Sequence, residues 1–257
     1  MCLPSQLEQE FKSCLELAIY MLKTLGLYED VSYRFSQWDP DDRAKYIGTP
    51  EQWDEAQSVM QKILDHLEIP YKIGIGEAAF YGPKLDIQIR NVHGKEDTLI
   101  TIQIDQMLAE KFGMVYTDSD GSKKKPYIIH RTSIGCYERT LALLLEKYAG
   151  ALPTWLMPTQ VKVLPISERQ QDRANAVLEQ LQAAGLRAAA DLRSEKIGYR
   201  IREAQLEKTP YMLIIGDKEV ENGTVSVRAR KGEDLGAMSV EDFLARILEE
   251  IRTKAHD

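Results

Sequence analysis

Apolar residues recur at helical spacing in two segments near the start of the chain. Between residues 5 and 27 they return every three or four positions, which predicts an amphipathic helix that Gly26 ends. A second helix is predicted over residues 49–67, because Thr49 can act as its N-cap and Gln52 completes a capping box. The segment VSYRF at 31–35, between the two helices, is predicted to be a strand.

The middle of the chain alternates strand-like runs with polar turns. The runs LDIQIR (85–90) and LITIQI (99–104) flank the turn-rich segment NVHGKED, and the apolar run 127–129 follows another polar turn. This order predicts an antiparallel meander. A further short run, 132–136, leads into a helix predicted over residues 137–148.

The segment GALPTWLMPTQ, with prolines at 153 and 158, interrupts all periodicity and is the predicted domain boundary. It separates a domain of residues 1–157 from one of residues 158–257. The second part alternates between the strand-like runs VKVLPIS, LRAAADL, YMLIIG and TVSVRAR and helices predicted at 168–184, 197–208 and 240–254. The predicted fold class is therefore α/β, with an antiparallel sheet in the first part and a mixed or parallel sheet in the second.

The composition narrows the class of protein. Of 257 residues, 44% are hydrophobic and 28% charged, which excludes disordered, collagen-like and disulfide-scaffold proteins. No run approaches the roughly 18 consecutive apolar residues of a membrane span. Cys2, Cys14 and Cys136 form no CxxC pair, which is typical of a reducing compartment. We therefore expect a cytoplasmic protein that is neither inserted into a membrane nor secreted.

The charge is acidic overall but basic in one region. The net charge of −7 argues against general coating of DNA or other nucleic acid, whereas residues 193–231 contain nine lysines and arginines against six acids. These basic residues gather on a predicted strand, with Arg228 and Arg230, and around the start of a helix, with Lys196, Arg200 and Arg202. Such an arrangement suits phosphates or base edges. A solvated charged face is the alternative.

Two polar motifs in the first part could carry chemistry. In AAFYGPKLD, a Tyr-Gly-Pro turn presents Tyr81 and Lys84 on one rim, and the strand that follows carries Asp86. An ordinary loop with a solvated lysine is the alternative. In TIQID, Gln103 and Asp105 are alternate residues of a strand, so both face the same way, into a cleft or into water.

The helix predicted from residue 137 begins with Glu138 and Arg139. A helix N-terminus favours anions, so an arginine there suggests an anionic ligand such as a phosphate, shared with the helix amides. Pairing of Arg139 with a neighbouring acid is the alternative. His130 is the one histidine in a strand context, and a lone histidine is more often a hydrogen-bonded structural residue than a metal ligand.

Five blocks of sequence resemble a known family. AFYGPKLD, TIQID, IIHRTSIGCYERTLALLLEKYAGALPTWLMP, SEKIGYRIRE and GDKEVENGTVSVRAR stand in the order in which the C-terminal half of threonyl-tRNA synthetases, a class II aminoacyl-tRNA synthetase family, has them. The resemblance covers the chain from its first residue to its end. It implies an ATP-dependent ligase that activates threonine and transfers it to a threonine-accepting tRNA.

The resemblance also assigns roles to individual residues of the first domain. It implies that Lys84, Gln103 and Arg139 are catalytic residues, with Gln103 facing the adenylate and Arg139 on the phosphates of ATP, which binds with Mg²⁺. Tyr81 resembles a substrate-binding residue beside threonine. In the family, one Cys and two His hold a zinc ion that recognises threonine, and His130 resembles the last of these three ligands.

The second domain resembles the anticodon-binding module of the family. Glu219 and Arg228 resemble positions that recognise anticodon bases, and Lys196 and Arg202 resemble positions near the anticodon loop. A carboxylate that accepts from a base amino group and a guanidinium that donates to base acceptors are the chemistry that such recognition needs.

Several features of the family pattern are missing. Motif 1, which builds the family's homodimer interface, motif 2, the editing domains and two zinc ligands have no counterpart here, and Cys2 does not match the zinc cysteine. Leu99 and Ile100 also replace a common Cys-Gly pair. The chain is therefore expected to be a C-terminal portion that forms no threonyl adenylate by itself. A non-catalytic RNA-binding accessory protein and a prolyl, glycyl or histidyl synthetase are the alternatives.

Overall fold

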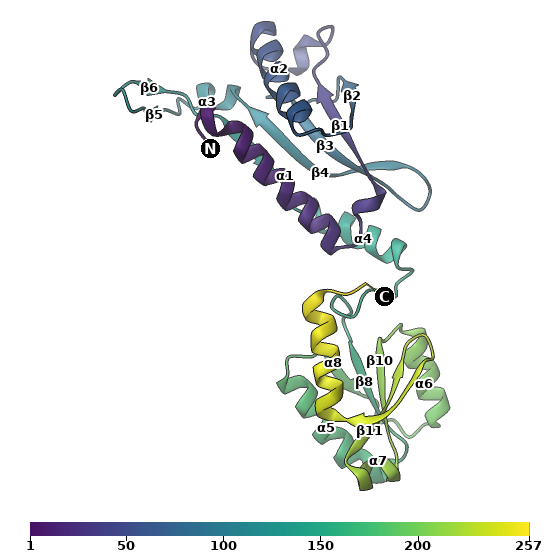
Figure 1. The fold of residues 1–257 in the computed structure, drawn as a ribbon. Helices are drawn as coiled ribbons and strands as arrows, with labels where there is room; N and C mark the ends of the chain where they lie inside the picture. Colours follow the sequence, from purple (N-terminus) through teal and green to yellow (C-terminus); the bar gives the residue numbers. More distant parts are fainter. Residues whose placement is uncertain (257) are drawn as a thin grey trace. The chain divides into compact units, whose positions relative to one another are not determined.

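The computed structural model describes residues 1–256, and the chain folds as two units, Met1–Leu143 and Leu144–Asp257 (Figure 1). The division falls within the helix α4 (Tyr137–Lys147). The domain boundary predicted at residue 157 stays a prediction. Within the described residues, no helix has the length and apolar character that crossing a membrane requires.

A five-stranded sheet forms the centre of the N-terminal unit, with the strand order β2-β1-β3-β4-β7. The strands are β1 (Val31–Gln37), β2 (Tyr71–Ile75), β3 (Lys84–Arg90), β4 (Glu96–Asp105) and β7 (Ile128–Arg131). The predicted antiparallel pairing of the three meander strands β3, β4 and β7 is confirmed. The strand β2 was not predicted, and it pairs in parallel with β1, so the sheet is not antiparallel throughout.

Helices and a small hairpin complete this unit. They are α1 (Leu7–Thr24), α2 (Pro50–His66), α3 (Met107–Lys111), α4, and the two-stranded ribbon of β5 (Tyr116–Thr117) and β6 (Lys123–Lys124). Short 3-10 turns precede α1, β1 and α2, at Pro4–Gln6, Tyr28–Asp30 and Arg43–Lys45. The predicted capping box of α2 is confirmed: Thr49 Oγ1 accepts from the amide of Gln52, and Gln52 Oε1 accepts from the amide of Thr49.

The two faces of this sheet differ in character. Alternate residues of a strand point to opposite faces. One face carries aliphatic side chains that are all buried: Leu85, Ile87 and Ile89 from β3, and Ile100, Ile102 and Ile104 from β4. The opposite face carries polar side chains: Lys84, Asp86 and Gln88 from β3, and Thr101, Gln103 and Asp105 from β4. The sheet therefore has one aliphatic face that is buried and one polar face.

The C-terminal unit is built on a mixed sheet with the order β12-β11-β10-β8-β9. Its strands are β8 (Val161–Pro165), β9 (Ala188–Ala190), β10 (Tyr211–Ile215), β11 (Thr224–Ala229) and β12 (Asp234–Ser239). The strand β8 pairs in parallel with β9 and β10, whereas β11 pairs antiparallel with β10 and β12. The predicted mixed sheet is confirmed.

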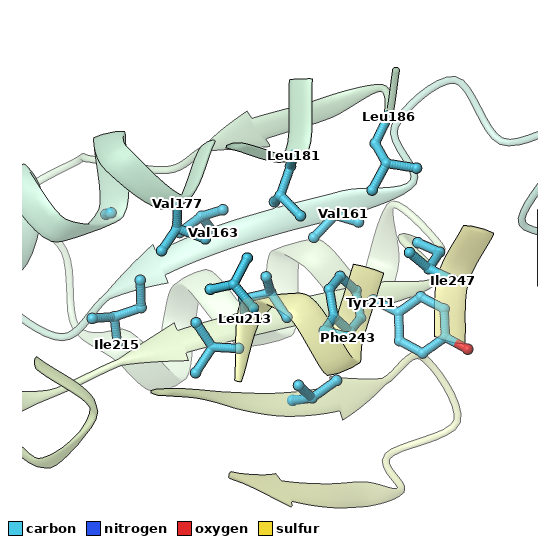
Figure 2. Packing of buried hydrophobic residues seen from close by; sticks show 14 residues of the cluster. Val161, Val163, Val177, Leu181, Leu186, Tyr211, Leu213, Ile215, Phe243 and Ile247 are labelled. Carbon is cyan, nitrogen blue, oxygen red and sulfur yellow. The ribbon is translucent and has the colours of Figure 1, made fainter. Parts of the chain in front are cut away.

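Helices pack on both faces of this sheet. The helices α5 (Gln171–Ala183) and α8 (Val240–Thr253) cover one face, where Val177, Leu181, Phe243 and Ile247 meet the valines of β8 (Figure 2). On the other face, α6 (Ile197–Leu206) buries Ala204 against Leu164, Met212 and Ile214. The short helix α7 (Asp217–Asn222) follows β10.

The segment predicted as a domain boundary is fixed to the C-terminal unit by hydrogen bonds to its backbone carbonyls. Arg187 donates from Nε to Met157 and from Nη2 to Trp155, at 2.9 and 2.8 Å. Gln160 Nε2 donates to the carbonyl of Thr154 at 3.1 Å. The carbonyls of this segment lie outside regular helices and strands, and the side chains of Arg187 and Gln160 supply their hydrogen bonds. These bonds hold the segment in a defined conformation.

Candidate functional site

Three of the predicted site residues lie in one row across the polar face of the N-terminal sheet. In the strand register, Lys84 on β3 is opposite Gln103 on β4, and Gln103 is opposite His130 on β7. Neighbouring strands are about 4.8 Å apart, so the three side chains are side by side. The structure thus brings together residues that are far apart in the sequence.

Tyr81 joins this row from the turn before β3. Its hydroxyl donates to Gln103 Oε1, and its ring centroid is 5.0 Å from that of His130. Gly82 allows this approach, because a Cβ there would overlap the carbonyl oxygen of Ile104. Burial, and then the nearby charge of Asp105, raise the pKa of Tyr81 above its usual 10, so the phenol remains a hydrogen-bond donor at neutral pH.

Lys84 is not a solvated loop lysine. Its side chain is only 20% exposed, and its Nζ is 2.8 Å from Oδ2 of Asp86, whose side chain is 1% exposed. Asp86 also accepts hydrogen bonds from Ser36 Oγ and Thr101 Oγ1, both at 2.7 Å. Three donors therefore surround this buried carboxyl group and satisfy its hydrogen-bonding capacity.

Asp105 departs from the expected direction, since it points neither into a cleft nor into water. It is fully buried at the end of β4, where Oδ1 accepts from the amides of Met107 and Leu108 at 2.9 Å. Its Oδ2 is 2.9 Å from Nε2 of His130. The sequence pattern placed Asp105 and Gln103 on the same face of the strand but did not predict that Asp105 binds the first amides of α3 and contacts His130. The turn into α3 is the one local feature that indicates the backbone hydrogen bonds.

Arg139 is exposed in the first turn of α4 and lies apart from the row. Its guanidinium donates through Nη1 to the carbonyl of Thr98, five residues before Gln103 on β4, a separation of about 17 Å along an extended strand. The turn before α4 rests directly on β4, because a Cβ at Gly135 would overlap the carbonyl oxygen of Leu99. A ligand that touched both Arg139 and Lys84 would have to be extended.

The donor set for a metal ion is incomplete in this chain. Among residues 1–256, no three His, Cys, Asp or Glu side chains come together in a group that could hold a metal ion. His130 has Asp105 as its carboxylate partner, and Cys2 is buried where its backbone pairs with Tyr127. The described residues therefore do not form the expected zinc site by themselves.

In the C-terminal unit, Lys196 lines a cavity of about 510 Å³ beyond the carboxyl ends of β8 and β9. Arg193, Ser167 and Arg169 line the same cavity. The cavity is open at the edge of a parallel sheet region, the usual place for ligands in α/β folds. Arg202 is exposed on α6.

One member of the predicted basic cluster has a different role. Arg200 is only 2% exposed, and it donates to the backbone carbonyls of Asp191, Pro165 and Ile166 at 2.8, 2.7 and 3.3 Å. The expectation that Arg200 serves phosphates or bases was wrong, since its guanidinium is occupied by the chain itself. It fixes the two loops that border the cavity.

The remaining predicted RNA contacts lie around β10 and β11. Glu219 Oε2 accepts from the amide of Gly216 at 2.8 Å at the start of α7. Arg228 on β11 is 42% exposed, and its Nη2 is 4.0 Å from Asp234. Arg230, two residues further along the chain, donates to the carbonyl of Leu152 at 2.7 Å and so holds the segment predicted as a domain boundary.

Two known families match the chain. Residues 1–148 match the family described as the tRNA synthetase class II core domain (G, H, P, S and T), and residues 160–250 match the anticodon binding domain family. The chain is 60% identical over 253 residues to a threonine–tRNA ligase of Clostridium perfringens and 42% identical over 254 residues to one of Staphylococcus aureus. These alignments cover 98% of the chain but only 39% of each relative.

A solved structure is also similar. The RNA binding domain of threonyl-tRNA synthetase from Cryptosporidium parvum superposes with a TM-score of 0.89 at 31% identity, over 97% of this chain and 62% of that one. The class II core family alone matches more than half of the chain. The chain therefore belongs to the class II aminoacyl-tRNA synthetases, and within them to the threonyl-tRNA synthetase family.

Proposed function

We propose that this chain is a portion of a threonine–tRNA ligase that carries one side of the adenylate-forming pocket and the anticodon-binding domain. The observation that carries the proposal is the row of Lys84, Gln103 and His130 on the polar face of the sheet, with Tyr81 bound to Gln103. The reaction joins the carboxylate of threonine to the α-phosphate of ATP with release of pyrophosphate. It then passes the threonyl group to a hydroxyl of the terminal adenosine of tRNA with release of AMP.

The proposed roles follow from charge and hydrogen-bonding capacity. Lys84 and Arg139 supply positive charge to the phosphates of ATP, which binds as its Mg²⁺ complex. Gln103 and Tyr81 supply fixed hydrogen-bonding groups to the adenylate and to threonine. Groups held in place before the reaction cost no reorganisation when charge develops on the phosphate, and this is the main source of catalysis in such sites. Asp86 holds Lys84 in this way.

A zinc ion, bound in the family by one cysteine and two histidines, would select threonine by its amino and hydroxyl groups. Among the described residues, His130 is the one candidate ligand, and these residues do not complete the site. We expect the chain alone to form no threonyl adenylate, because the metal site is incomplete among the described residues. The chain spans 39% of the length of the relatives that it matches.

The C-terminal domain is proposed to bind the anticodon of a threonine-accepting tRNA through Glu219 and Arg228, with Lys196 and Arg202 near the anticodon loop. The exposed guanidinium of Arg228 suits donation to base acceptors. We further propose residues 1–157 and 158–257 as the two domains, cytoplasmic localisation, and assembly of the complete enzyme as a homodimer.

Binding measurements on the purified chain test this proposal. Threonine-accepting tRNA should bind more tightly than prolyl, glycyl or histidyl tRNA, and Arg228→Glu should weaken that binding while Arg139→Ala leaves it unchanged. Arg252→Glu is the matched charge reversal, because Arg252 is 72% exposed on α8 beside Glu249. Preference for another tRNA would overturn the threonine assignment.

Binding of ATP separates the ligase from a non-catalytic accessory protein. A chain that keeps part of an adenylate-forming pocket should retain ATP affinity that depends on Lys84 and Arg139. An accessory RNA-binding protein would bind tRNA with the same dependence on Arg228, but its affinity for ATP would not change in Lys84→Ala or Arg139→Ala. Threonine-dependent exchange of pyrophosphate into ATP by the chain alone would contradict the expected lack of activity.

A further inference from the structure

A second cavity of the C-terminal unit lies at the end of the sheet opposite to the cavity that Lys196 lines. It has a volume of about 240 Å³, and its walls include Tyr211, where β10 begins, and Ala229, where β11 ends. Pockets for drug-sized ligands have volumes of about 300–1,000 Å³. This cavity is smaller and therefore suits a small chemical group.

The cavity has a positively charged lining although the protein is acidic. Among the described residues that line it, three are cations, Arg230, Lys231 and Arg246, and one is an acid, Glu233. The lining thus has a net charge of +2, whereas the whole chain has a net charge of −7. Lys231 and Arg246 are exposed, the first in the turn after β11 and the second on α8. A concave surface with charges of one sign attracts small ions of the opposite sign, here anions.

Thr154 provides a second observation that is independent of charge. It lines the same cavity and is only 1% exposed. Its hydroxyl oxygen is buried and has no hydrogen-bond partner in the part of the chain that the structure describes, whereas its carbonyl is fixed by Nε2 of Gln160 at 3.1 Å. Buried polar groups are normally hydrogen-bonded, so an unpartnered hydroxyl in a cavity wall indicates a donor for a polar ligand.

Other hydrogen bonds hold the walls of the cavity in place. Arg230 donates from Nη1 to the carbonyl of Leu152 at 2.7 Å. The hydroxyl of Tyr211 donates to Oε2 of Glu250 at 2.6 Å, and the ring of Tyr211 packs in the core of the unit (Figure 2). The cavity is therefore formed by groups that are already fixed before a ligand binds.

We propose that this cavity binds a phosphate group, for which Lys231 and Arg246 supply positive charge and Thr154 supplies a buried hydroxyl donor. A phosphate has several acceptor oxygens, so it can accept from an ammonium, a guanidinium and a hydroxyl at the same time. Two sources share this chemistry, a phosphate of an RNA backbone and a free phosphate ion. The RNA source rests on the proposed function, because Arg228 on β11 directly precedes Ala229 of the cavity wall.

Titration with inorganic phosphate tests the cavity without tRNA. At constant ionic strength, the amide signals of Tyr211 and Ala229 in ¹H–¹⁵N correlation spectra of the wild type should shift to saturation. Lys231→Gln and Arg246→Gln should each lower the affinity for phosphate by about tenfold or more, the usual effect of losing a hydrogen bond to a charged group. Arg252→Gln should not change the affinity. It is the matched control, because Arg252 is an exposed cation of the same helix as Arg246 and pairs with Glu249.

Thr154→Val separates phosphate binding from a structural role. It removes a hydroxyl that has no partner among the described residues, so the free energy of unfolding without phosphate should not fall, whereas the affinity for phosphate should fall by about tenfold. Thr209→Val is the matched control, because Thr209 is also 1% exposed with an unpartnered hydroxyl but lies outside the cavity lining. A wild type without saturable shifts, or an affinity that the Lys231, Arg246 and Thr154 variants leave unchanged, would overturn the proposal.

The salt dependence of tRNA binding identifies the source of the phosphate. If an RNA phosphate occupies the cavity, Lys231→Gln should weaken tRNA binding and lower the slope of log K against log salt concentration by about 1. An unchanged slope in a variant that has lost inorganic phosphate would assign the cavity to a free phosphate ion. A chain that binds no tRNA would contradict the proposed function, and the titration with inorganic phosphate would still decide whether the cavity binds phosphate.

Discussion

Lys84 and Asp86 form an ion pair of 2.8 Å, in which the aspartate side chain is almost completely buried and the lysine side chain is one-fifth exposed. They are alternate residues of β3, so both side chains are on the polar face of the sheet. Ser36 and Thr101, on the two neighbouring strands, donate to the same carboxylate. The pair is therefore part of a network across three strands that fixes the position of Lys84.

Replacement of Asp86 tests this network. Asp86→Asn keeps the shape but removes the charge that Lys84 and two hydroxyl donors require, so we expect a loss of about 1–3 kcal/mol in the free energy of unfolding. ATP binding should weaken as well, because Lys84 loses its anchor. Hydrogen exchange of β3 and β4 amides measures the stability of this sheet separately from the C-terminal unit.

The matched control is Asp97→Asn, since Asp97 pairs with Lys95 at 3.5 Å on the exposed edge of the hairpin. Such partly exposed pairs contribute about 0–1 kcal/mol. Equal losses in the two variants would show that Asp86 has no special role in the sheet.

Gly135 should tolerate no side chain. Its φ of +74° belongs to the left-handed region, and a Cβ would overlap the carbonyl oxygen of Leu99. We expect Gly135→Ala to cost about 1–2 kcal/mol for the backbone conformation, plus about 1–3 kcal/mol for overpacking. The turn that leads to Arg139 would have to move away from β4, and ATP affinity should fall with it.

Gly121→Ala provides the comparison. Gly121 has a φ of +80°, but no atom lies within 4 Å of the place that a Cβ would occupy, so only the conformational cost applies. Denaturant unfolding of both variants should show the larger loss for Gly135→Ala. A result in which both alanines cost the same would mean that the turn before α4 adapts freely.

Most helices and strands could be predicted because strand alternation and helix capping depend on residues that are close together in the sequence. The alternation in LDIQIR and LITIQI reflects the two faces of one sheet, and Thr49 with Gln52 closes a capping box within four residues. The short helix α7 and the strand β12 were missed. The first is six mostly polar residues long, and the second carries Gly236 at a φ of +78°, so neither has a clear apolar period.

The site could be predicted only in part. Tyr81, Lys84 and Gln103 stand in recognisable motifs, and the register of the sheet brings them together. The burial of Arg200 could not be predicted, because its partners are backbone carbonyls from two distant loops. A carbonyl has no side-chain signature, and an arginine that binds carbonyls looks in the sequence like one that binds phosphate.

Acid should weaken the C-terminal unit through Asp191. The hydrogen bond from Arg193 lowers the pKa of Asp191 below its ordinary 3.8, with Nη2 and Nε of Arg193 at 2.6 and 2.9 Å from the carboxylate. A carboxyl group whose pKa is lower in the folded state stabilises it fully above the ordinary value, and this contribution is lost as the pH falls below 3.8.

The variant Arg193→Ala should therefore be less stable than the wild type at neutral pH. The difference should shrink as the pH falls below 3.8, because Asp191 becomes protonated there and the contribution of its lowered pKa is lost. Hydrogen exchange of β8 amides provides the measurement. Arg169→Ala is the control, because Arg169 is 78% exposed and 3.4 Å from Asp217, and its effect should be small at both pH values. A constant deficit in Arg193→Ala would argue against the linkage.

Arg139 should affect ATP binding far more than it affects folding. A cation in the first turn of a helix is unfavourable by about 0.3–1 kcal/mol, and its loss in Arg139→Ala offsets the loss of the hydrogen bond to Thr98. Hydrogen bonds to a charged partner are worth about 1.5–3 kcal/mol, so ATP affinity should fall by about 10- to 150-fold. Arg139→Lys keeps the charge without the planar fork and should restore only part of the lost ATP affinity.

Arg131→Ala is the matched control, since Arg131 follows His130 on β7 and so faces away from the polar row. Calorimetric titration with ATP in which Arg131→Ala weakens binding as much as Arg139→Ala would place the phosphates elsewhere.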